Sequence, residues 1–239
     1  MASRKTPFET GEYYHIYNRG IDKRNIFSYQ KDLDRFFKSM IEFNVLEPIG
    51  SIYENSFDKR LGGEASKLSK VSKNKEKKLI DFIAYCINPN HYHFIIQQVS
   101  DRGIVKFMHR LGTGYTMYFN EKEKRSGSLF QGVFKSIHIN SNEYLLHLSA
   151  YVNLNNRAHQ LGGEASKSKL IESKSSWGEY SGNGKESGKK DAKKGICKKN
   201  IILEQFRNKK NYKEFALESL EAIQQRKNEL EDIQEFLLE

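Results

Sequence analysis

Two histidines one residue apart, His91 and His93, are the first feature of the sequence that could carry chemistry. They follow Asn88-Pro89-Asn90, and runs rich in Ile and aromatic residues lie on both sides, which predicts two strands joined by a tight turn. Side chains alternate between the two faces of a strand, so both imidazoles project from one face and could share a metal ion. The alternative is a pair of polar residues on a solvated strand face, and the spacing alone leaves both readings open.

A tyrosine and an asparagine further along the chain are the second such feature. Residues 140–157 predict a helix, with Ser141 or Asn142 able to cap its start and an apolar stripe along one side. Tyr151 and Asn155 are four residues apart and therefore share a face of that helix. Beside a two-histidine metal site, the phenol would be a nucleophile and the amide oxygen a third ligand. An ordinary half-buried tyrosine is the alternative.

Four segments of the chain appear in the order found in a known family: Tyr14–Arg24, Ala84–Phe94, Gly127–Ser136 and Tyr151–Asn155. Together, over about residues 8–158, they resemble the single-tyrosine HUH transposases, in particular the REP-associated tyrosine transposases. The resemblance implies a transposase and single-strand endonuclease that cleaves and rejoins DNA next to hairpins through a 5′-phosphotyrosine intermediate. A non-catalytic hairpin nucleic-acid-binding protein derived from such an enzyme is the alternative.

The resemblance also implies a role for each residue. Tyr151 would be the nucleophile, and His91, His93 and Asn155 would hold a divalent cation, Mg²⁺ or Mn²⁺. The cation would withdraw charge from the phosphate and favour the phenolate of a tyrosine, whose pKa is about 10 when free. The chain departs from the family after Asn155, where Asn156 stands in place of a common proline, and this leaves the end of the helix uncertain.

Several other residues compete for these roles or add to them. Tyr115 and Tyr118 are alternative nucleophiles, but neither has a ligand-type residue four positions on. Four polar residues are candidate DNA contacts, although each also suits a surface turn or a solvated face: Arg19, Arg110, Gln131 and Lys135.

The charge of the chain fits a nucleic-acid partner. The net charge is +10, and residues 213–239 hold three basic and eight acidic residues, so the remainder carries +15. The chain has two cysteines, no zinc-type spacing, and no apolar run long enough for a signal or a membrane span. We therefore expect a cytoplasmic, nucleoid-associated monomer or homodimer whose partner is single-stranded or hairpin DNA.

The expected order of elements is β-α-β-β-α-β-α, which predicts an α+β fold: a ferredoxin-like sandwich with one antiparallel sheet backed by helices, plus a C-terminal helical appendage. We predict a catalytic domain over residues 1–158 with a loop insertion at about 55–78, a flexible Lys/Ser/Gly-rich connector over 159–200, and a helical tail over 201–239. The heptapeptide Leu61–Lys67 recurs unchanged as Leu161–Lys167. We interpret it as a loop insertion, because it is too short for a solenoid unit.

Overall fold

Five strands form one antiparallel sheet in the computed structural model, which describes residues 7–50, 52, 77–158, 173–182 and 195–236. The strand order is β4-β1-β3-β2-β5, and every pairing between these strands is antiparallel. The α+β class with a single antiparallel sheet is therefore confirmed. The strands are β1 (Tyr13–Arg19), β2 (Ile80–Asn88), β3 (His91–Gln98), β4 (Lys135–His138) and β5 (Lys174–Ser175).

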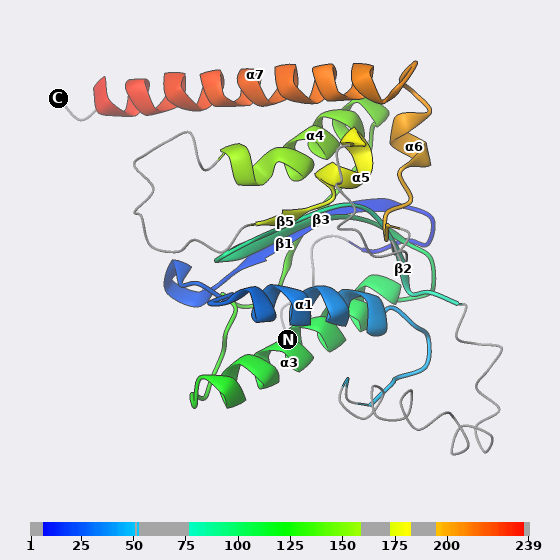
Figure 1. Ribbon diagram of the computed structural model, residues 1–239, viewed down its shortest axis with the longest axis vertical. Helices are drawn as coiled ribbons and strands as arrows, with labels where there is room; N and C mark the ends of the chain where they lie inside the picture. Colours follow the sequence, from blue (N-terminus) through cyan, green and yellow to red (C-terminus); the bar gives the residue numbers. More distant parts are fainter. Residues whose placement is uncertain (1–6, 51, 53–76, 159–172, 183–194, 237–239) are drawn as a thin grey trace.

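Helices cover both faces of this sheet (Figure 1). On one face lie α1 (Gln30–Glu42) and α3 (Gly103–Lys122), and on the other lie α4 (Asn142–Ala158), α5 (Trp177–Ser181) and α7 (Lys209–Phe236). Two further helices are short, the 3-10 helix η1 (Ile21–Lys23) and α6 (Asn200–Leu203). The predicted helical appendage is present as α6 and α7, and α7 runs along the outer side of α4.

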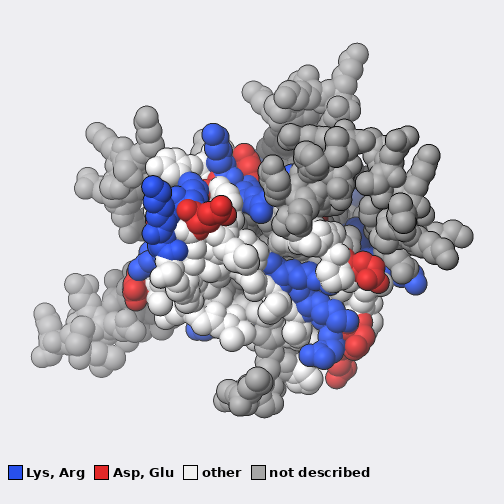
Figure 2. All heavy atoms as spheres, turned by 90° about the horizontal axis from the view of Figure 1, so that it is seen from below, with Lys and Arg blue, Asp and Glu red and all other residues white. Residues whose placement is uncertain are grey.

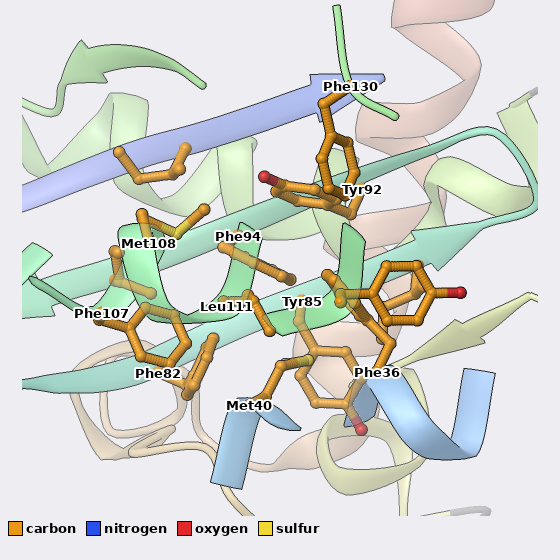
Figure 3. Packing of buried hydrophobic residues seen from close by; sticks show 14 of the residues in the cluster. Phe36, Met40, Phe82, Tyr85, Tyr92, Phe94, Phe107, Met108, Leu111 and Phe130 are labelled. Carbon is orange, nitrogen blue, oxygen red and sulfur yellow. The ribbon is translucent and has the colours of Figure 1, made fainter. Parts of the chain in front are cut away.

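Each face of the sheet has its own apolar core, and the alternation of side chains along β3 divides its residues between them. Tyr92, Phe94 and Ile96 belong to the core under α1 and α3, whereas Ile95 belongs to the core under α4 and α7. Figure 3 shows the first core, where Phe36 of α1 packs against the rings of β3. Because helices cover both faces, all nine residues of β2 are buried.

The same alternation fixes where the two histidines point. His91 and His93 are on the Ile95 side of β3, so they face α4, and Tyr92 between them is buried in the opposite core. The sheet thus carries the histidines to the helix that bears Tyr151 and Asn155.

The structure fixes two element boundaries that the sequence left open. The fourth strand of the expected order, β4, spans only Lys135–His138, because the chain turns at Gly132 (φ +71°) and leaves Val133 exposed. Phe130 instead forms a single bridge with Gly20. At the end that the sequence left uncertain, α4 continues through Asn156 and ends at Ala158. Among the helices described, none is both long and apolar enough to cross a membrane.

The repeat at residues 61–67 and 161–167 lies outside the described residues, as do most of the predicted loop insertion and connector. Within the predicted connector, residues 174–175 add the edge strand β5 to β2, and Trp177 of α5 packs in the second core. The division into a catalytic domain, a connector and a tail remains a prediction.

Candidate active site

The four residues singled out for catalysis meet between β3 and α4. The His91 and His93 rings lie 5.2 Å apart between centroids, almost perpendicular to each other. The edge of the Tyr151 ring contacts His93 at a centroid distance of 5.6 Å. The Nε2 atom of His91 is 3.1 Å from the side-chain oxygen of Asn155. Residues 60 positions apart in the sequence thus form one cluster of two imidazoles, an amide and a phenol.

The hydrogen bond of His91 to its neighbour determines which ring nitrogen is available. Its Nδ1 atom lies 2.6 Å from the side-chain oxygen of Asn90, and because that oxygen only accepts, Nδ1 carries the proton. In the neutral ring, Nε2 then presents a lone pair toward Asn155. Metal-binding histidines typically have this arrangement, with the second nitrogen held by an oxygen acceptor.

A third histidine, His15 of β1, holds His93. The Nε2 atom of His15 is 2.9 Å from Nδ1 of His93, and the two rings stack. Burial lowers the pKa of His15 to about 4, so its ring is neutral at neutral pH. Tyr17, directly opposite His93 in the strand register, stacks on both imidazoles.

Sequence reasoning missed both His15 and Tyr17. Their spacing on a predicted strand was a signal, since they share a face of β1. The sequence alone could not place them beside His93, because the register of β1 on β3 is set by contacts between distant parts of the chain.

Asn88, the last residue of β2, also belongs to this cluster, and the sequence did not predict it. Its Nδ2 atom lies 2.8 Å from Nε2 of His91 and 2.7 Å from the side-chain oxygen of Asn155. Asn88 is only 3% exposed and Asn155 is fully buried. The Nδ2 atom of Asn155 has no hydrogen-bond partner among the described residues.

The environment of Tyr151 keeps its hydroxyl protonated. Burial raises the pKa of the phenol, and the neighbouring Asn155 amide offsets part of that rise. A nucleophilic role would therefore need positive charge beside the hydroxyl. The histidine that precedes Tyr151 by one turn, His147, is instead engaged with α7, because its Nδ1 atom lies 3.1 Å from the hydroxyl oxygen of Ser219.

The donor atoms fit a divalent cation. Imidazole nitrogens and an amide oxygen suit Mn²⁺ and Mg²⁺, and the lone pair of His91 and the oxygen of Asn155 already converge. Among the described residues, no group of three His, Cys, Asp or Glu side chains comes together. Any site here would therefore depend on amide oxygens as well as histidines.

Two of the candidate DNA contacts lie beside this cluster. In the strand registers, Arg19 is opposite His91, and Lys135 is opposite Tyr17, so both share the sheet face of the histidines. Arg19 donates a hydrogen bond to the side-chain oxygen of Gln131, which brings that third candidate to the same edge. These three residues could surround a phosphate backbone entering the site.

The fourth candidate lies elsewhere. Arg110 is on α3, across the sheet from α4, and its guanidinium donates to the carbonyls of Val45 (2.5 Å) and Leu46 (3.0 Å). These contacts secure the chain after α1. A DNA contact by Arg110 remains a prediction. On the face shown in Figure 2, Lys and Arg side chains gather in more than one group with acidic side chains beside them.

The alternative nucleophiles are also on the α3 side of the sheet. Tyr115 is fully buried and its hydroxyl donates to the carbonyl of Ile26 at 2.7 Å. The hydroxyl of Tyr118 donates to Asp32 at 2.9 Å. Both hydroxyls thus have structural partners far from the histidines.

Comparison with known proteins finds a family that resembles the part of the chain that holds this cluster. The family model described as "Transposase IS200 like" matches residues 55–155. Residues 55–155 are therefore similar to the IS200-like transposases. The segment includes both histidines and Tyr151, and ends at Asn155, so the family resemblance inferred from the sequence is confirmed. The relationship supports a DNA-recombining enzyme in general terms.

One solved structure similar to this chain is titled "Structure of the REP associates tyrosine transposase bound to a REP hairpin". The two chains are 12% identical, with a TM-score of 0.45, and the match covers 77% of this chain and 87% of the other. Comparison with curated proteins gave no match.

Proposed function

We propose that this protein is a metal-dependent tyrosine transposase and single-strand endonuclease. It cleaves and rejoins single-stranded DNA next to hairpins through a 5′-phosphotyrosine intermediate on Tyr151. The observation that carries the proposal is the meeting of His91, His93, Tyr151 and Asn155 between β3 and α4. The family match over residues 55–155 supports it independently.

The nucleophile in this proposal is the Tyr151 hydroxyl. It attacks the scissile phosphorus, the bond from phosphorus to the 3′ oxygen breaks, and a free 3′-hydroxyl leaves. The phenol proton passes to solvent, the departing 3′ oxygen takes up a proton from solvent, and the new phosphotyrosine ester keeps the DNA end activated. A 3′-hydroxyl can reverse the same step, so strands can be rejoined without ATP.

The remaining residues bind and orient. His91, His93 and Asn155 would hold Mg²⁺ or Mn²⁺, which supplies charge stabilisation at the phosphate oxygens when bound. His15 and Asn90 hold the two imidazoles in place.

Arg19 and Lys135 would contact the DNA backbone on the same sheet face, assisted by Gln131. Phosphate contacts of this kind position a strand and make its affinity fall as salt rises.

A covalent-adduct assay tests the proposal. The protein is incubated with Mn²⁺ and an oligonucleotide that contains a hairpin with single-stranded flanks and a 3′ label. We expect a labelled protein–DNA species on a denaturing gel, which is lost when EDTA removes the metal. We also expect a perfect duplex to react far more slowly, because a tyrosine fixed on a helix needs a bent, flexible phosphodiester.

Two variants make the assay specific. Tyr151→Phe removes one oxygen and should abolish the adduct. Tyr144→Phe is the matched control, because Tyr144 is a half-buried tyrosine on the same helix, and the adduct should persist. A normal adduct from Tyr151→Phe would contradict the assignment. Tight binding of the hairpin by the wild-type protein without any cleavage would favour the non-catalytic binding protein instead.

A further inference from the structure

A buried amide, Asn88, stands at the centre of the proposed site although the family resemblance gave it no role. Its Nδ2 atom, Nε2 of His91 and Oδ1 of Asn155 form a triangle with sides of 2.7, 2.8 and 3.1 Å. The three atoms come from the end of β2, the start of β3 and the last turns of α4.

The dimensions of this triangle match those of a metal coordination shell. Octahedral Mg²⁺ holds its ligands at about 2.1 Å, which places neighbouring ligand atoms about 3.0 Å apart. The three atoms are thus spaced as one triangular face of such a shell. Hydrogen bonds also explain these distances in the metal-free protein, since Nδ2 of Asn88 can donate one hydrogen to each of the other two atoms.

The other end of the Asn88 amide is weakly held, so the amide can exchange its ends at low cost. Among the described residues, its oxygen accepts only a long contact from the Cys86 thiol, with 3.6 Å between sulfur and oxygen. A half-turn of the amide would place Oδ1 toward His91 and Asn155 and leave Nδ2 facing the weakly accepting sulfur.

We propose that Asn88 is a further ligand-bearing residue of the cation site, which presents its side-chain oxygen beside His91 and Asn155 when the cation is bound. In the metal-free protein the same amide keeps the two ligand atoms converged through its nitrogen. This inference rests on the proposed function, because it assumes that the cation binds at His91, His93 and Asn155.

The test measures Mn²⁺ binding by titration calorimetry and needs no DNA or activity. Asn88→Leu keeps the approximate volume and removes the oxygen, and we expect its affinity for Mn²⁺ to fall by about tenfold or more. Asn88→Asp offers a carboxylate oxygen at the same position and should bind Mn²⁺ at least as tightly as the wild type. This second variant keeps the test informative if Asn88→Leu fails to fold.

Asn153→Leu is the matched control. Asn153 is a fully buried amide on the same helix as Asn155, but it bonds to Tyr212 and Ser176 and not to the histidines. Its loss should leave the affinity for Mn²⁺ unchanged. Unchanged affinity in Asn88→Leu, or equal weakening in Asn88→Leu and Asn88→Asp, would overturn the assignment of Asn88.

A His91→Ala, His93→Ala double variant separates this inference from the function on which it rests. If the double variant loses Mn²⁺ binding while Asn88→Leu keeps it, only the role of Asn88 is refuted. If the double variant binds Mn²⁺ like the wild type, the proposed metal site itself is wrong, and the role of Asn88 falls with it.

Discussion

A buried chain of hydrogen bonds connects the C-terminal helix to the helix that bears Tyr151. The hydroxyl of Tyr212, on α7, accepts from Nδ2 of Asn153 at 2.9 Å and lies 3.0 Å from the hydroxyl oxygen of Ser149. The side-chain oxygen of Asn153 accepts in turn from Ser176 at 2.6 Å. All four residues are fully buried, so no water replaces a lost partner.

Tyr212→Phe tests this connection by removing a single oxygen atom. The substitution leaves Nδ2 of Asn153 buried without this acceptor, and an unsatisfied buried donor costs about 1–3 kcal/mol. For a chain of this size, each kcal/mol lowers the melting temperature by about 2–4 °C. We therefore expect a loss of about 1–3 kcal/mol in the free energy of unfolding, with a melting temperature lower by several degrees.

Urea denaturation followed by circular dichroism measures the loss, with Tyr144→Phe as the control. The hydroxyl of Tyr144 makes no hydrogen bond within the described part of the chain, so its removal should cost little. The effect of Asn153→Leu should also be smaller in the Tyr212→Phe background than in the wild type, because the two residues share a bond. A Tyr212→Phe loss no larger than that of the control, or strictly additive effects, would refute the reasoning.

Three further predictions follow from the contacts described above. His15→Phe removes the hydrogen-bond partner of His93 and should weaken Mn²⁺ binding by about 10–100-fold in calorimetry; unchanged affinity would show that His15 has no positioning role. Burial raises the pKa of Asp32, but hydrogen bonds, first among them that from Lys122, outweigh it and lower the pKa overall. Asp32 therefore stabilises the fold above the pKa of the unfolded carboxyl, about 3.9, and this contribution is lost as pH falls through the lower folded pKa. As the pH is lowered, the melting temperature of Asp32→Asn should therefore fall less than that of the wild type. An equal pH dependence of the two melting temperatures would contradict this. Finally, the affinity for hairpin DNA should fall as salt rises, with a shallower slope for Lys135→Gln, and identical slopes in a fluorescence titration would exclude a phosphate contact at that residue.

The sequence by itself determined the local parts of the site. The spacing of His91 and His93 on a strand put both rings on one face, and the four-residue interval from Tyr151 to Asn155 put both side chains on one side of a helix. These are consequences of strand and helix periodicity, which any short segment carries within itself. The succession of strands and helices likewise predicted the α+β class, and the family resemblance supplied the expectation that these two parts meet.

Only the tertiary structure decided what surrounds those parts. His15, Tyr17 and Asn88 complete the cluster because β1 and β2 flank β3 in a particular register, and a shift by one residue would turn each to the opposite face. The register depends on the packing of two cores and on the long crossovers between strands, so no local pattern encodes it. Arg110 shows the opposite outcome. An arginine on a helix face was a candidate DNA contact, but in the folded protein its guanidinium donates to backbone carbonyls. Periodicity fixes which way a side chain leaves its own element, whereas contacts between distant segments decide what it meets.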